Sequence, residues 1–217
     1  MGTREGGGSR SETVRWARLV FWSCVALFVF RVVDTSLYGA LAARGSALAV
    51  LADVRVSSLA LLAAGYGASR RGPTREMPVW TRGPDPRTRR LAIVWLAGVF
   101  LCVHFLGVGK IPLARWENRV AHLFTGVLAE ELLCRGLVLG AALAIWRTGW
   151  RPIAWSAVVF AAMHLQYHGF RLDGLALAQL VWTLPQGAMF ATIAVRTRSL
   201  LFVVLLHIAN NVLVFLA

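Results

Sequence analysis

The stretch HLFTGVLAEELLCRGLVLGAALAIW, from His122 to Trp146, decides the fold of this chain. It is long and apolar enough to cross a bilayer as a helix, yet it carries the adjacent carboxylates Glu130 and Glu131. One charge at the centre of a membrane helix costs roughly 2.5–3.5 kcal/mol on insertion scales. Two charges side by side, with Arg135 one turn later, therefore predict a functional site inside a membrane protein.

The composition of the whole chain agrees with a membrane protein. Of its 217 residues, 58% are hydrophobic, whereas ordinary soluble domains are about 45–50% apolar. The formal net charge of +13 could suggest a nucleic-acid partner. The arginines, however, flank apolar runs of membrane length, so we expect a lipid bilayer and no nucleic acid as partner. The three cysteines lack C-x-x-C spacing, which argues against disulfides and cysteine zinc sites.

The hydropathy pattern predicts an all-α, polytopic transmembrane bundle. A polar, Gly/Ser-rich tail, residues 1–13, is expected to be disordered. Residues 14–110 hold N-terminal spans and an Arg/Pro-rich loop at 68–90, and residues 111–217 hold the polar motifs described next. The seven expected spans are 16–35, 46–67, 91–109, 119–146, 152–166, 173–195 and 199–217.

The positive charges predict an orientation for these spans. With the N-terminus inside, fifteen Lys and Arg residues fall in the inner segments and five in the outer ones. Cytoplasmic loops carry the excess of Lys and Arg, so we expect the N-terminus inside and the C-terminus outside. Under this topology the polar motifs lie towards the extracytoplasmic side.

Three polar motifs share an i, i+4 spacing in three different spans. Side chains four residues apart lie on one face of a helix, and polar side chains in membrane helices turn towards the bundle interior. The three faces are therefore expected to meet in one pocket. The motifs are E-E-x-x-x-R at 130–135, F-x-x-x-H at 160–164 and H-x-x-x-N at 207–211.

Helical geometry gives the two glutamates different roles. Glu131 and Arg135 are four residues apart, and a glutamate that precedes its arginine is in the favourable order for an ion pair. Glu130 points about 100° away from that pair, because an α-helix has 3.6 residues per turn. We expect Glu131 and Arg135 to form a scaffold and Glu130 to act as a base. The alternative, a purely structural ion pair, accounts for Glu131 and Arg135 but not for Glu130.

The order of the three motifs resembles that of the Rce1-like family of intramembrane proteases, also called the CPBP family. This family includes type II CAAX prenyl endopeptidases and bacteriocin-immunity relatives. The resemblance covers about residues 115–217 and implies that Glu130 activates the hydrolytic water with help from His164. It further implies that His207 and Asn211 stabilise the oxyanion. The supporting residues are Glu131, Arg135 and Phe160.

The resemblance implies an intramembrane endopeptidase in the plasma membrane of a bacterium. It would hydrolyse a peptide bond near the C-terminus of a membrane-associated or lipid-anchored protein. An extracytoplasmic opening fits C-terminal sorting tails of secreted proteins better than prenylated cytosolic proteins. The alternatives are a non-catalytic membrane immunity or binding protein, against which the complete motifs argue, and a proton-coupled transporter. The chain lacks the inverted repeat of broken helices typical of such transporters.

The involvement of a metal stays open at this point. Glu130, His164 and His207 could form a three-ligand zinc site with one open position. The H-E-x-x-H pattern is absent, so we favour a metal-free glutamate mechanism. His168 could pair with His164 at i, i+4, but Gly169 indicates that the helix ends there, which favours an interfacial His168.

Overall fold

A computed structural model describes residues 84–106, 126–146, 149–168 and 171–215. Every regular element within these ranges is a helix, and these ranges contain no strand. The expected tail 1–13, the spans 16–35 and 46–67, and the part of loop 68–90 before residue 84 lie outside the described residues. The all-α class is confirmed for the described part of the chain.

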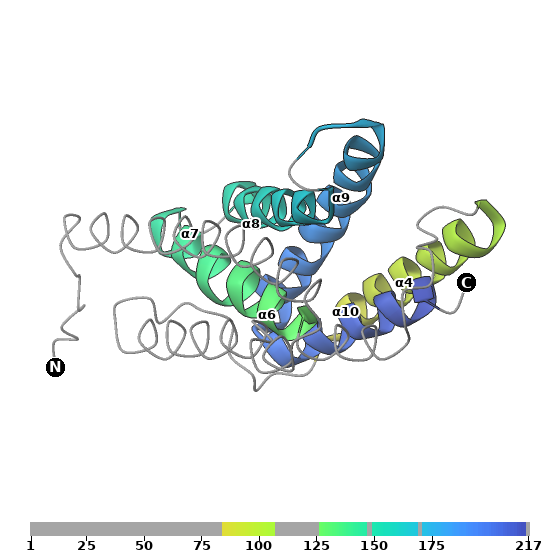
Figure 1. The fold of residues 1–217 in the computed structure, drawn as a ribbon. Coiled ribbons are helices and arrows are strands. Elements are labelled where there is room, and N and C mark those ends of the chain that lie inside the picture. The colour runs from red at the N-terminus through yellow and green to blue at the C-terminus, as the bar shows by residue number, and fades with distance from the viewer. Residues whose placement is uncertain (1–83, 107–125, 147–148, 169–170, 216–217) are drawn as a thin grey trace, which may run out of the picture.

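Five of the expected spans coincide with helical segments (Figure 1). The third span is α4 (Pro86–Leu106). The fourth is one run made of α6 (Val127–Glu131), a π-helical segment η2 (Leu132–Val138) and α7 (Leu139–Trp146). The last three are α8 (Trp150–Met163) with a 3-10 segment η3 (His164–His168), α9 (Gly174–Thr197) and α10 (Leu200–Phe215).

One described helix meets the length and composition needed to cross a membrane, namely the stretch Pro86–Phe105 of α4. Leu200–Val214 of α10 is a shorter apolar helix. The run from α6 to α7 is interrupted by its π-helical segment, and α9 carries Gln179 and Gln186 among its apolar residues. The count of seven spans therefore stays a prediction.

Short polar side chains fix where the helices begin. Asp85 precedes α4, and its Oδ1 accepts hydrogen bonds from the backbone N–H groups of Arg87 (2.8 Å) and Thr88 (3.0 Å). Asp173 caps α9 by accepting from the backbone N–H of Ala176 at 2.8 Å. Ser199 precedes α10 and accepts from the backbone N–H of Phe202 at 3.2 Å. Helices α9 and α10 begin within one residue of the predicted spans 173–195 and 199–217. Helix α4 begins at Pro86, five residues before the predicted span, so the predicted loop 68–90 is wrong for residues 86–90, because the Asp85 cap starts the helix there.

The run from α6 to α7 and the helices α8, α9 and α10 pack around the polar motifs. Helix α8 packs against α9, and α10 lies along α4 (Figure 1). Helix α10 also contacts α6 and α9, and α7 packs on α8. A buried apolar cluster joins the π-helical segment to α8 and α10 through side chains such as Leu133, Phe160 and Val204. The residues at 130–135, 160–164 and 207–211 lie around this cluster.

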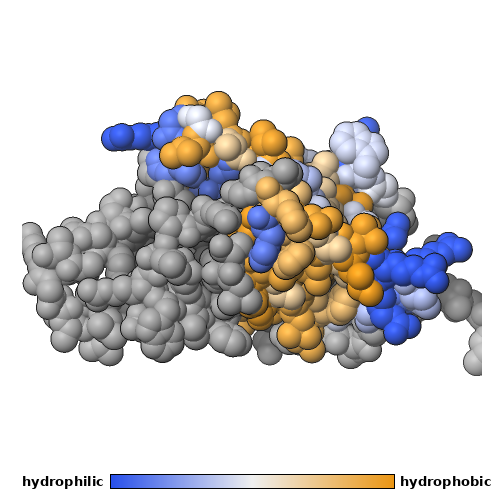
Figure 2. Space-filling model, turned by 90° about the vertical axis from the view of Figure 1, so that its right-hand side faces the viewer, coloured by the Kyte–Doolittle hydropathy of each residue, from blue (hydrophilic) through white to orange (hydrophobic). Residues whose placement is uncertain are grey.

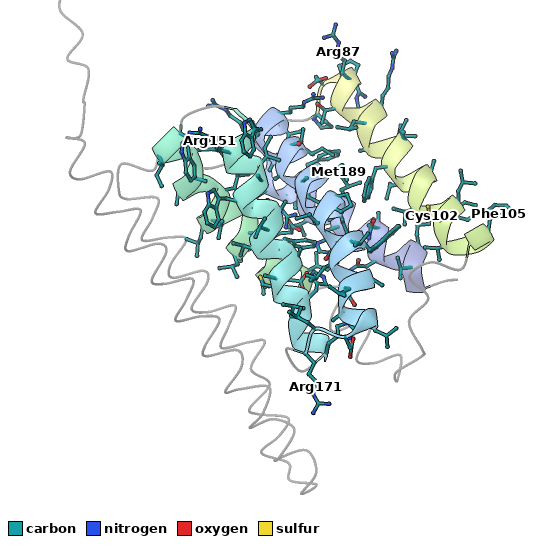
Figure 3. The ribbon with its side chains drawn as sticks, turned by 90° about the horizontal axis from the view of Figure 1, so that it is seen from above. Arg87, Cys102, Phe105, Arg151, Arg171 and Met189 are labelled. Carbon is teal, nitrogen blue, oxygen red and sulfur yellow. The ribbon has the colours of Figure 1, made fainter. Side chains whose placement is uncertain are left out.

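The described surface is apolar between charged ends. Figure 2 shows apolar side chains over most of the described surface of that view and hydrophilic ones towards its edges. Large apolar side chains stand exposed on α4 and α9, including Val94 (69%) and Val181 (75%). In Figure 3, Arg87 and Arg151 mark the first turns of α4 and α8 at one end, and Arg171 lies at the opposite end. Such a surface suits a hydrocarbon surrounding.

Candidate active site

The two glutamates are the last residues of α6, directly before the π-helical segment. Their exposed fractions are 2% for Glu130 and 0% for Glu131, and Arg135 in the π-helical segment is also at 0%. A short π-helical insertion in a helix is frequent at functional sites, because it re-aims the side chains on either side. These charged side chains are therefore buried inside the bundle, as expected for polar groups in a membrane helix.

One oxygen of Glu131 joins two of the expected motifs. Its Oε1 accepts from a terminal nitrogen of Arg135 at 3.0 Å, which is the predicted i, i+4 ion pair. The same oxygen lies 2.7 Å from Nδ1 of His207, a residue 76 positions later on α10. Glu131 is thus more than a partner for Arg135, because it also holds the imidazole ring of His207.

Arg135 is surrounded by side chains and backbone from α8 and α9. Its second terminal nitrogen donates to the carbonyl oxygen of Gly187 at 3.2 Å. Its guanidinium carbon lies 4.4 Å from the ring centre of Phe160 and 5.4 Å from that of Phe190, within cation–π range. The planar group is thereby held in one orientation, which in turn fixes Glu131.

His207 presents its other ring nitrogen to Glu130. Oε1 of Glu131 accepts from Arg135 and carries no proton, so the proton of the 2.7 Å contact belongs to Nδ1 of His207. Nε2 then faces Oε2 of Glu130 at 3.9 Å. In a neutral imidazole, Nε2 is the unprotonated acceptor nitrogen, and it becomes a donor only in the imidazolium form.

His164 adopts a similar arrangement at the end of α8. Its Nδ1 lies 2.8 Å from the backbone carbonyl oxygen of Phe160, which can only accept, so this nitrogen also carries a proton. The imidazole ring lies 4.7 Å from the ring of Phe160. His164 is close enough to Glu130 and His207 to interact with both electrostatically. The structure therefore brings Glu130 and both histidines into one polar cluster.

Asn211 lies one turn after His207 and is half-buried. Its Oδ1 accepts from the side-chain amide of the neighbouring Asn210 at 3.3 Å. Asn210 has an exposed fraction of 1%, and its own Oδ1 accepts from the indole N–H of Trp95 on α4 at 3.1 Å. The resemblance implied Asn211 as a donor to the oxyanion, and the structure adds a hydrogen-bonded chain behind it.

His168 is separated from the cluster by the change of helix type. The chain tightens into a 3-10 segment at His164, and residues four apart in a 3-10 helix differ by about 120° in direction, since it has three residues per turn. Nε2 of His168 lies 3.2 Å from the side-chain oxygen of Gln179 on α9. The pairing of His164 and His168 at i, i+4 on one face therefore does not form.

Within the described ranges, no group of three or more His, Cys, Asp or Glu side chains is placed to hold a metal ion. The zinc set of Glu130, His164 and His207 stays a prediction, and no step below is derived through a metal.

Four residues at the site were given no role by the sequence analysis: Gly187, Phe190, Asn210 and Trp95. An asparagine pair inside an apolar helix did carry a signal, because buried amides need partners. Gly187 was also visible as a glycine inside a long helical pattern, which can mark a close approach of two backbones. Phe190, whose ring lies 4.9 Å from that of His207, resembles any core phenylalanine in the sequence.

Comparison with known proteins places these residues in a family. Residues 115–213 match the family described as type II CAAX prenyl endopeptidase Rce1-like. No curated protein and no solved structure matches the chain. The matched segment contains all three motifs and runs from before α6 almost to the end of α10. Residues 115–213 of this chain therefore form a domain of the Rce1-like family, which is a family of membrane-embedded proteases.

Proposed function

We propose that this protein is an intramembrane endopeptidase that uses Glu130 to activate water. The observation that supports this most is the double contact of Glu131, whose Oε1 binds both Arg135 and Nδ1 of His207. This contact directs Nε2 of His207 towards the carboxylate of Glu130. A carboxylate that faces an imidazole nitrogen in a buried pocket suits general acid–base catalysis.

The charges of the cluster suggest which protonation states take part. Buried charges are costly unless they are paired. Glu131 and Arg135 neutralise each other. An ionised Glu130 beside two neutral histidines carries one negative charge, so these three side chains become neutral as a group when they bind one additional proton. That proton resides on Glu130, or on a histidine beside an ionised Glu130. The second arrangement supplies a carboxylate base and an imidazolium donor together.

The hydrolysis proceeds in two steps. The Glu130 carboxylate takes a proton from water while the water oxygen attacks the scissile carbonyl carbon, and His164 orients that water through Nε2. The resulting oxyanion accepts hydrogen bonds from protonated Nε2 of His207 and from the amide of Asn211, which stabilises it. Glu130 then passes its proton to the leaving amine as the C–N bond breaks. His207 acts as an imidazolium in this step.

The substrate is a protein held at the membrane and cleaved near its C-terminus. The exposed apolar faces of α4 and α9 and the apolar surroundings of the cluster support a substrate that arrives through the bilayer. The chain crosses the membrane several times, with its N-terminus inside. The arginines support this orientation: among the described residues, Arg87, Arg89, Arg90, Arg151, Arg196 and Arg198 lie at helix ends of one side, and Arg171 lies at the other.

The orientation can be tested with single cysteines at exposed positions. We expect Arg171→Cys to react with a membrane-impermeant maleimide added to intact cells, and Arg151→Cys to react only after the cells are opened. The reverse pattern would place the N-terminus outside and the site on the cytoplasmic side.

The catalytic proposal is tested with full-length protein in liposomes and two internally quenched peptides, one ending in a farnesylated CAAX sequence and one in an apolar C-terminal tail. Glu130→Gln should lower kcat by at least the roughly 10²–10⁴-fold that a general base contributes. The matched control is Asp173→Asn, which removes a carboxylate at the exposed cap of α9 and should leave kcat unchanged, because asparagine caps equally well.

Two outcomes would contradict the proposal. Cleavage at the normal rate by Glu130→Gln would exclude Glu130 as the base. A pH-dependent proton flux through liposomes that is lost in Glu130→Gln, without any peptide cleavage by the wild type, would indicate a transporter instead.

A further inference from the structure

A chain of hydrogen bonds reaches Asn211 from a helix outside the family-matched segment. The indole N–H of Trp95 on α4 donates to Oδ1 of Asn210 at 3.1 Å. The side-chain amide nitrogen of Asn210 then donates to Oδ1 of Asn211 at 3.3 Å. Trp95 precedes residues 115–213, so this contact is a property of the present chain and not of the matched segment alone.

The direction of this chain follows from the chemistry of its first member. An indole nitrogen can donate and cannot accept a hydrogen bond. The atom of Asn210 that faces Trp95 must therefore be the oxygen, and the NH₂ group of Asn210 must occupy the other branch of the amide. A donor that points at Asn211 requires an acceptor there, so Oδ1 of Asn211 faces Asn210 and the NH₂ group of Asn211 points away from it.

We propose that Trp95 and Asn210 are positioning residues that keep the NH₂ group of Asn211 available as a donor to the oxyanion. This inference rests on the proposed function, in which Asn211 stabilises the tetrahedral intermediate. The two branches of a primary amide have nearly the same shape, so an unrestrained asparagine can rotate by half a turn. It then presents its oxygen, which repels an oxyanion and removes one stabilising hydrogen bond.

Burial makes the restraint effective. Asn210 is 1% exposed, and its contact with Trp95 joins α10 to α4, the helix that packs along it. Water therefore has little access to replace the indole as a donor. A reversed Asn210 would place its NH₂ group against the indole N–H, two donors facing each other, and would leave both without an acceptor.

The first test uses Asn210→Asp, Trp95→Phe and the control Trp155→Phe, all in full-length protein in liposomes with the two quenched peptides named above. Asn210→Asp still accepts from Trp95 but has no donor, so Asn211 must turn its NH₂ group towards it. We expect kcat to fall about 10²–10³-fold, the usual effect of losing one oxyanion donor, while KM changes less than about twofold.

Trp95→Phe keeps a smaller aromatic ring and removes the donor. Both orientations of Asn210 then become comparable in energy, and kcat falls with the productive fraction, about two- to fivefold. Trp155 is 48% exposed on α8 and stacks on Trp146, away from the hydrogen bonds of Asn210, so Trp155→Phe should keep the wild-type kcat.

The decisive measurement repeats Asn210→Asp and Trp95→Phe in an Asn211→Ala background. If both residues act through Asn211, neither substitution lowers kcat further in that background. Equal fold losses in the two backgrounds would overturn the positioning role and indicate a general effect on the fold. Thermal unfolding of each variant identifies misfolding, and Trp95→Phe decides the question if Asn210→Asp does not fold.

Failure of this inference can be told apart from failure of the proposed function. Wild-type kcat for Asn210→Asp and Trp95→Phe, beside inactive Glu130→Gln and impaired Asn211→Ala, would overturn the positioning role alone. Wild-type kcat for Glu130→Gln would overturn the proposed function and the positioning role with it.

Discussion

Gly187 offers the sharpest test of how the site is held together. A Cβ atom at this position would lie 3.0 Å from the backbone Cα of Ala157 and 3.0 Å from Cδ1 of Phe160. Ordinary contacts of a Cβ lie at 3.4–4 Å, so Gly187→Ala forces α8 and α9 apart by several tenths of an ångström. The carbonyl oxygen of the same residue accepts from Arg135 at 3.2 Å, which leaves little room for that bond to lengthen.

The expected loss of stability combines two terms. Overpacking of a well-packed interface costs about 1–3 kcal/mol, and a weakened hydrogen bond from a buried guanidinium costs up to about 1.5–3 kcal/mol. Because the two effects share one displacement, we expect Gly187→Ala to lower the free energy of unfolding by about 2–5 kcal/mol. The assay is thermal unfolding of the detergent-purified protein. The fraction that stays folded after heating is measured as the height of the monodisperse size-exclusion peak.

Gly174→Ala is the matched control, because it lies in the same helix and a Cβ there would meet nothing within 4 Å. It should be neutral or raise stability by up to about 1 kcal/mol, since alanine lowers the conformational entropy of the unfolded chain. Equal unfolding temperatures for Gly187→Ala and the wild type would refute the close approach of α8 and α9 at the site.

Three further predictions follow from the same structure. Arg135→Leu leaves the buried Glu131 carboxylate without its cation and should cost about 3–5 kcal/mol in unfolding free energy; the double variant with Glu131→Leu should recover part of this, and no recovery would argue against the pair. The hydrogen bond from the Thr88 side chain lowers the pKa of Asp85. The stabilisation by ionised Asp85 is therefore present above the pKa that Asp85 has in the unfolded chain, and it is lost as the pH falls through the lower pKa of the folded protein. The difference in unfolding temperature between wild type and Asp85→Ala should shrink from pH 7 to pH 3, and a constant difference would contradict this sign. Dialysis against a chelator should leave peptide cleavage within about twofold of the untreated enzyme, because general acid–base groups alone can activate the water, and a loss that added zinc restores would favour the zinc alternative.

Much of the fold could be predicted because its signals are local. The helix starts after Asp173 and Ser199 follow from capping side chains next to apolar runs, and the Glu131–Arg135 pair follows from spacing within one helix. The contact between Glu131 and His207 could not be predicted in this way, because it depends on how two helices far apart in the chain face each other. The π-helical segment was missed for a related reason, since apart from Arg135 its sequence is mostly apolar, like the α-helices around it.

The adjacent glutamates are explained by the geometry of that π-helical boundary. Oε1 of Glu131 is occupied by Arg135 and by Nδ1 of His207. With two successive glutamates, the helix places one carboxylate in this network and the other opposite Nε2 of His207, where the proposed function needs a base. The network is costly to bury, and replacing it by apolar side chains would often be neutral or stabilising. The feature it provides is therefore directional: it determines which nitrogen of His207 carries a proton and which one Glu130 meets.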